Sequence, residues 1–164
     1  MKTVILVRHA KSSWDNIGEA DIDRPLNERG KKDAPEMAKR LKKRDLEVDA
    51  FITSHAKRAR RTARAFAEEF GLDKKDVVIN EDLYGAYASG FDKVIASLPE
   101  KYKTVALFSH NPGITEFVNT LTGVQVDNMP TAAIFAVSSE AETWEDFKTS
   151  EKQFLFFDYP KNPL

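Results

Sequence analysis

The feature that most restricts the fold is a set of short, continuous apolar runs that alternate with amphipathic segments of helical period. The first run, Val4 to Val7, is rich in β-branched residues, which is typical of a strand buried on both faces. Further strands are predicted at Ala50 to Thr53, Val77 to Ile79, Thr104 to Phe108, Ala132 to Val137 and Phe154 to Phe157. Strands that alternate with helices favour βαβ units, and so we expect a three-layer α/β/α sandwich with a mostly parallel central sheet.

The helices are predicted from apolar spacing and from residues that suit helix ends. Asn27 and Asn111 are predicted N-caps, and Ser89 with Asp92 forms a near capping box before a third helix. Pro35 lies inside the pattern that follows Asn27, so that helix either kinks there or starts later. Residues 11–25 lack periodicity and are predicted to form a long loop of the kind that carries function.

Composition excludes several classes of protein. A length of 164 residues predicts a single domain over 1–164. The 25 Lys+Arg and 26 Asp+Glu residues give a net charge of -1, which favours neither nucleic acid nor anionic membrane as a partner. With no cysteine, we expect neither disulfides nor thiolate chemistry. The first apolar run is shorter than a signal peptide requires, and no run approaches the ~20 residues of a membrane span. We therefore expect a cytoplasmic protein.

Cationic and imidazole side chains follow three of the predicted strands. Arg8 and His9 come directly after the first strand, Arg58 opens the helix after the second, and His110 follows Thr104 to Phe108. Because the carboxyl ends of parallel strands meet at one edge of a sheet, where ligands bind, we expect these four residues, here called the edge cluster, to lie together.

The edge cluster suits the handling of a phosphoryl group. Two arginines can clamp the phosphoryl oxygens, since a guanidinium is always charged and bonds two oxygens at once. A neutral imidazole such as that of His9 can attack phosphorus and hold the group until water removes it. The second imidazole, His110, can complete the set of donors to the oxygens.

Four motifs in this order resemble the histidine phosphatase superfamily, which has the phosphoglycerate-mutase-like fold, and in particular its SixA-type phosphohistidine phosphatase branch. They are Val-Arg-His-Ala at 7–10, Arg-Pro-Leu-Asn-Glu-Arg-Gly at 24–30, Ser54 to Ala63, and Ser-His-Asn-Pro-Gly at 109–113. The resemblance implies that His9 accepts the phosphoryl group and that the rest of the edge cluster binds its oxygens. It also implies weaker substrate-binding roles for Arg24 and Asn111, which flank the expected pocket.

The resemblance is incomplete at the position of a general acid. Many members carry a glutamate after the third strand, where this chain reads Leu83-Tyr84, and Glu81 and Asp82 are displaced from that position. An alkoxide leaving group needs such an acid, whereas the imidazole of a phosphohistidine can leave already protonated. We therefore predict hydrolysis of phosphohistidine, either on a protein or in a small substrate. The alternative is a phosphatase for small phosphate monoesters that uses Glu81 or Asp82 as the acid.

A second alternative is a noncatalytic module that binds phosphorylated ligands or nucleic acid. It is suggested by the basic residues Lys57, Arg60, Arg61 and Arg64, although their spacing is that of a solvated helix face. The three histidines lack the carboxylate spacing of a metal site, so we expect no metal, no cofactor and a metal-independent reaction.

Overall fold

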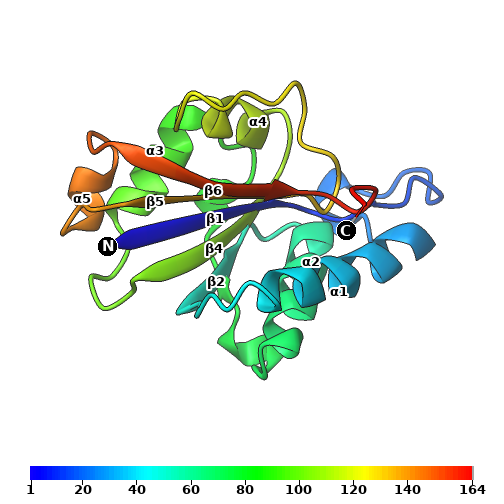
Figure 1. The fold of residues 1–164 in the computed structure, drawn as a ribbon. Coiled ribbons are helices and arrows are strands. Elements are labelled where there is room, and N and C mark those ends of the chain that lie inside the picture. Colours follow the sequence, from blue (N-terminus) through cyan, green and yellow to red (C-terminus); the bar gives the residue numbers. More distant parts are fainter. Residues whose placement is uncertain (164) are drawn as a thin grey trace.

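The computed structural model describes residues 1–163 and contains a six-stranded sheet in the order β3-β2-β4-β1-β5-β6 (Figure 1). The strands are β1 (Lys2–Arg8), β2 (Ala50–Thr53), β3 (Val78–Ile79), β4 (Thr104–Ser109), β5 (Ile134–Ser139) and β6 (Lys152–Asp158). The first four pair in parallel, while β5 runs antiparallel to both β1 and β6. The predicted mostly parallel sheet is confirmed.

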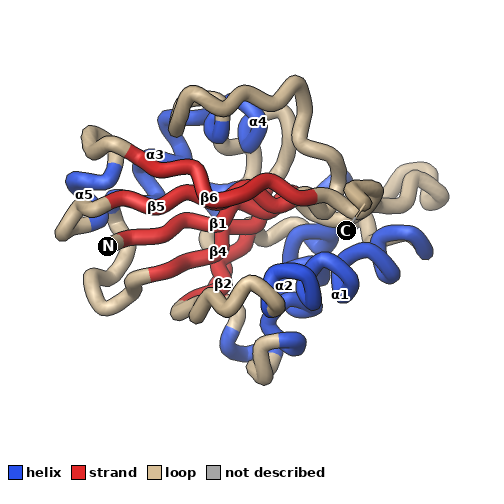
Figure 2. Tube along the Cα trace, in the orientation of Figure 1, coloured by secondary structure: helices blue, strands red, loops and turns tan. Residues whose placement is uncertain are grey.

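Helices cover both faces of this sheet (Figure 2). They are α1 (Glu28–Lys42), α2 (Lys57–Glu69), α3 (Ala88–Ala96), α4 (Gly113–Val118) and α5 (Trp144–Phe147), with short 3-10 turns η1 (Asp21–Asp23), η2 (Lys74–Asp76) and η3 (Glu81–Leu83). One core lies under α1 and α2 and the other under α3, α4 and α5, which gives the predicted three layers. None of the helices in residues 1–163 is long and apolar enough to cross a membrane.

Strand β1 lies between β4 and β5 and contributes to both cores. Ile5 and Val7 pack in the core under α1 and α2, whereas Val4 and Leu6 pack in the opposite core, and all four side chains are fully buried. This burial explains why the run contains no polar residue, because each face of the strand meets apolar side chains. The centre of the sheet therefore delivers the end of β1, at Arg8, to the carboxyl edge.

The helix beginnings differ in part from the sequence predictions. Asn27 is the N-cap of α1, where its side chain accepts from the Gly30 N–H at 2.9 Å, and the helix continues through Pro35. The capping box predicted at Ser89 is wrong, because α3 begins at Ala88 with Tyr87 as an N-cap that makes no side-chain bond.

The N-cap predicted at Asn111 is also wrong, because α4 begins two residues later, at Gly113. The Asn111 side chain is used elsewhere. Its Oδ1 accepts from the Thr115 hydroxyl at 2.6 Å, and its Nδ2 donates to Asn128 and to the Met129 carbonyl at 2.7 and 3.2 Å. Asn111 thus ties the start of α4 to the segment that leads into β5.

Candidate active site

The structure brings the edge cluster together at the carboxyl ends of β1, β2 and β4. The rings of His9 and His110 are 5.1 Å apart between centroids. Arg8 and Arg58 lie near enough for their charges to contribute to lowering the pKa of His9. The parallel registers that pair Arg8 with Ser109 and Thr53 with Phe108 produce this arrangement, because they bring the three strands to a common end. The chemical roles of the four residues stay predictions.

His9 is buried and held in one tautomer. Its Nδ1 lies 2.7 Å from the carbonyl oxygen of Ala10, and since a carbonyl can only accept, Nδ1 carries the proton. Nε2 therefore carries the lone pair. Burial lowers the pKa of His9 well below its usual value, and the neighbouring His110 and the positive charges of Arg58 and Arg8 act in the same direction. At neutral pH the imidazole is uncharged and can act as a nucleophile.

His110 is buried beside it and also neutral. Its Nε2 is 2.6 Å from the hydroxyl of Ser54, while its Nδ1 is buried without a hydrogen-bond partner in the described chain. When the Ser54 hydroxyl donates to Nε2, Nδ1 carries the proton and is a donor. Burial, and secondly the charge of Arg58, lower the pKa of His110 to about 3. An anion bound nearby would favour the protonated form instead.

The two arginines of the edge cluster share one bonding pattern. Arg8 Nη1 donates to the Met129 carbonyl at 2.9 Å, and the terminal nitrogens of Arg58 donate to Asp21. In each arginine the Nε is buried and has no partner within residues 1–163. A buried guanidinium nitrogen without a partner is costly, so each Nε is a donor suited to an anion.

Thr62 fixes the spacing between β1 and α2. Its hydroxyl donates to the Arg58 carbonyl at 2.8 Å and accepts from the Ala10 N–H at 2.9 Å. Both bonds are buried. The residue after His9 is thereby joined to the first turn of α2, which carries Arg58.

The two weaker candidates are engaged by other parts of the chain. Arg24 donates from Nε to Asp21 at 3.1 Å and from Nη1 to the Ser12 hydroxyl at 2.8 Å, and its guanidinium stacks on Trp14. Asn111 uses both ends of its amide in the contacts described above. It shares the Met129 carbonyl with Arg8, so it lies beside the edge cluster.

Sequence reasoning missed Asp21 and Tyr84. Asp21 accepts from the Tyr84 hydroxyl at 2.6 Å as well as from Arg58 and Arg24. Partial burial acts to raise the pKa of Asp21, but the hydrogen bonds from Tyr84 and the two arginines outweigh it and hold that pKa well below its usual range. The only sequence signal was the acidic pair Asp21 and Asp23 just before Arg24.

The carboxylates predicted for the ester alternative lie elsewhere. Glu81 and Asp82 are exposed in η3, and among residues 1–163 no hydrogen bond or ion pair joins either side chain to the edge cluster. Asp21 is the carboxylate that the structure joins to Arg58. Since its pKa is lowered, it is ionised and has no proton to donate.

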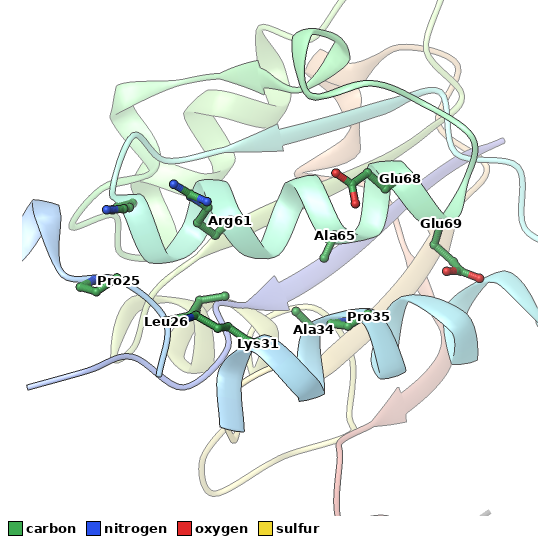
Figure 3. Close-up of a pocket in the computed structure, with 10 residues that line it drawn as sticks. Pro25, Leu26, Lys31, Ala34, Pro35, Arg61, Ala65, Glu68 and Glu69 are labelled. Atoms are coloured by element: carbon green, nitrogen blue, oxygen red, sulfur yellow. The ribbon is translucent and has the colours of Figure 1, made fainter. Parts of the chain in front are cut away.

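A groove of about 530 Å³ lies between α1 and α2, away from this chemistry (Figure 3). Leu26, Ala34 and Ala65 contribute apolar surface to it, and Arg61 and Glu68 lie along α2 in the same view. No residue of the edge cluster lines it. The groove is therefore a feature of the helical layer.

Comparisons with known proteins find similar sequences and folds. The family model described as histidine phosphatase superfamily (branch 1) matches residues 4–84. Phosphoserine phosphatase 1 from Hydrogenobacter thermophilus is 35% identical over 108 residues, a match that covers 63% of this chain and 50% of that enzyme. The chain thus spans half the length of that relative.

Solved structures extend the likeness over nearly the whole chain. A SixA protein from Agrobacterium tumefaciens is 26% identical and superposes with a TM-score of 0.80, covering 97% of this chain and 98% of that one. A protein histidine phosphatase SixA in complex with tungstate has the same fold, with a TM-score of 0.74 at 21% identity and 96% coverage of both chains. The sequence match and these structures together show that the chain is similar to the histidine phosphatase superfamily in sequence over residues 4–84 and in fold over nearly its whole length.

Proposed function

We propose that the protein is a phosphatase that hydrolyses phosphohistidine, carried on a protein, through a covalent intermediate on His9. Similarity to the histidine phosphatase superfamily supports the phosphatase class. One observation carries the proposal. The Nε atoms of Arg8 and Arg58 and the Nδ1 of His110 are buried without partners around a histidine whose Nε2 has a free lone pair.

The reaction has two steps. The lone pair of His9 Nε2 attacks phosphorus, a new N–P bond forms, and the N–P bond of the substrate breaks with its electron pair going to the leaving imidazole. A water then attacks the phosphorylated His9, which releases inorganic phosphate and restores the neutral imidazole. In both steps Arg8, Arg58 and His110 bind the phosphoryl oxygens and stabilise the charge of the transition state.

The absence of an available acid supports phosphohistidine over an ester. The leaving imidazole takes its proton before or during departure and needs no protonated carboxyl. Asp21 is ionised, and Glu81 and Asp82 are exposed and not joined to the edge cluster. The ester alternative draws on the likeness to a phosphoserine phosphatase, and it requires an acid from outside this set.

Exposed aromatic side chains support a protein as the carrier of the phosphohistidine. Trp14 is 73% exposed and stacks on Arg24 at 3.5 Å, and Tyr84 is 36% exposed and bonds Asp21. Tyr84 therefore contacts Asp21, the residue that holds Arg58, and Trp14 contacts Arg24, which also bonds Asp21. Large exposed aromatic groups beside a site are typical of surfaces that contact another protein.

Single-turnover assays with phosphohistidine and with p-nitrophenyl phosphate test the proposal. We expect rapid hydrolysis of phosphohistidine with transient, acid-labile phosphate on the protein. His9→Ala should remove the label and lower the rate on the order of a thousandfold or more. His55→Ala is the matched control, because the His55 ring contacts Tyr84 and not His9, and it should keep the label.

Three results would separate the alternatives. Hydrolysis that survives His9→Ala would refute the His9 intermediate. Faster turnover of the ester, lost in a Glu81→Gln, Asp82→Asn double variant, would establish the monoesterase. Phosphate binding without turnover of either substrate would overturn the enzyme assignment and favour the noncatalytic module.

A further inference from the structure

The contacts of Arg58 divide its guanidinium into two edges. A guanidinium is planar and can bind an anion end-on through its two terminal nitrogens or side-on through Nε and one terminal nitrogen. In Arg58 the end-on edge is occupied by one residue. Nη1 donates to the Asp21 carbonyl at 2.7 Å, and Nη2 donates to its carboxylate at 2.9 Å.

The other edge of Arg58 is left for a ligand. Its Nε is buried and has no partner in the described chain. Nη2 has a second N–H on that side, so Nε and Nη2 together can bind two oxygens of a phosphoryl group. Arg8 resembles Arg58 in part, because its Nη1 is held by the Met129 carbonyl and its buried Nε has no partner within residues 1–163.

From these contacts we propose that Asp21 is the positioning residue of Arg58, holding its end-on edge so that its side-on edge faces the phosphoryl group. The proposal rests on the proposed function only in assigning the phosphoryl group to Arg58. It also differs from the view that Asp21 is an internal anion which substrate must displace. A displaced anion would have to cover the edge that substrate uses, and Asp21 covers the opposite one.

Asp21 can hold Arg58 because two further side chains hold it, one from segment 80–88 and one from its own segment. The Tyr84 hydroxyl donates to the same Oδ2 at 2.6 Å, and Arg24 Nε donates to Oδ1 at 3.1 Å. Arg24 is 8% exposed, and its Nη1 donates to the buried Ser12 hydroxyl at 2.8 Å. Segments 11–25 and 80–88 thereby support one carboxylate. This gives Arg24 a positioning role through Asp21.

Four variants test the proposal. Asp21→Ala removes the acceptor, and Asp21→Asn keeps one side-chain oxygen while it removes the charge. Asp23→Ala is the matched control, since Asp23 is exposed in the same turn and has no hydrogen-bonded or ionic side-chain partner within residues 1–163. Tyr84→Phe removes only one donor to Asp21, so it is a milder change. Unfolding curves establish that each variant is folded before it is assayed.

Two readouts separate positioning from other roles. The first is the affinity for inorganic phosphate by calorimetry, and the second is kcat and KM with phosphohistidine. Asp21→Ala should weaken phosphate binding and lower kcat/KM by about 10- to 100-fold, because the clamp is misplaced. Asp21→Asn should keep most of the wild-type phosphate affinity and kcat/KM. Tyr84→Phe should lower both less than Asp21→Ala does, and Asp23→Ala should match wild type. In an Arg58→Ala background, Asp21→Ala should have no further effect.

Each contrary result would overturn the proposal. Tighter phosphate binding by Asp21→Ala would identify a displaced anion. Equal losses in Asp21→Ala and Asp21→Asn would identify a charge effect, and a further loss in the Arg58→Ala background would identify direct chemistry by Asp21. If wild type failed to turn over phosphohistidine, the proposed function would fall, while phosphate affinity would still decide the role of Asp21.

Discussion

Acidification from pH 7.0 to 5.5 should destabilise the fold through His9 and His110. Burial lowers the pKa of both, to about 3 for His110 and well below the usual value for His9, so both stay neutral when folded. In the unfolded chain each titrates near 6.5. The unfolded state then binds more protons below that pH, and the free energy of unfolding must fall as the pH falls.

The expected size follows from this linkage. At pH 5.5, one unit below the unfolded pKa, protonation stabilises the unfolded state by about 1.4 kcal/mol for each histidine, against about 0.2 kcal/mol at pH 7.0. Each residue therefore contributes a loss of about 1.25 kcal/mol, and the two together about 2.5 kcal/mol. The contributions add because neither imidazole is protonated in the folded state in this window.

Urea unfolding at the two pH values measures this loss. Between pH 7.0 and 5.5, the free energy of unfolding of the wild-type protein should fall by about 2.5 kcal/mol more than that of a His9→Gln, His110→Gln double variant. Each single variant should show a fall that lies about halfway between the two. The raised pKa of Asp92 affects all four proteins alike and cancels. An unchanged pH dependence in the double variant would show that the imidazoles are not held neutral by burial.

Two further predictions concern stability away from the edge cluster. A Cβ on Gly30 would lie 2.1 Å from the Lys11 carbonyl oxygen, so Gly30→Ala should lower the free energy of unfolding by about 1–3 kcal/mol in the same urea assay. Gly123→Ala is the control, because a Cβ there would have no atom within 4 Å, and it should change that free energy by less than about 0.5 kcal/mol. Asp158→Ala would remove the buried carboxylate that lies 3.2 Å from the half-buried Arg40 guanidinium, and Glu36 at 3.8 Å would remain as its counter-charge. We expect the free energy of unfolding to fall by about 1–3 kcal/mol. Calorimetry should show a smaller loss for Asp158→Asn, and equal losses would exclude the charge as the cause.

The central strands β1, β2, β4 and β5 were predictable because they are buried on both faces. A short continuous apolar run such as Val4 to Val7 is typical of a buried strand. Because parallel strands end at one edge of the sheet, the pattern also places together residues of the edge cluster that are about fifty positions apart in the sequence. The beginnings of α3 and α4 were not predictable from capping residues alone. At Asn111 the competing interaction is tertiary, since its amide bonds a segment seventeen and eighteen residues later in the chain.

The contact between Asp21 and Arg58 could not be read from the sequence. The two residues are 37 positions apart, and Asp21 lies in a segment without apolar periodicity, so no pattern fixes where its side chain points. The Tyr84 hydroxyl reaches the same carboxylate across 63 positions. Only the placement of segments 11–25 and 80–88 over the strand ends brings these groups together. A motif identifies residues that contact the reacting group more readily than residues that hold them.

The proposed reaction places two requirements on the edge cluster, a neutral His9 and a positive environment for an anion. A histidine nucleophile must be neutral to attack, yet the phosphoryl group that it accepts is anionic. In the proposed reaction Arg8 and Arg58 meet both requirements, because the positive potential that disfavours an imidazolium at His9 would also stabilise the phosphoryl oxygens. Asp21 offsets part of the charge of Arg58 from the edge away from the ligand. The cost of keeping His9 neutral is the acid sensitivity of the fold predicted above.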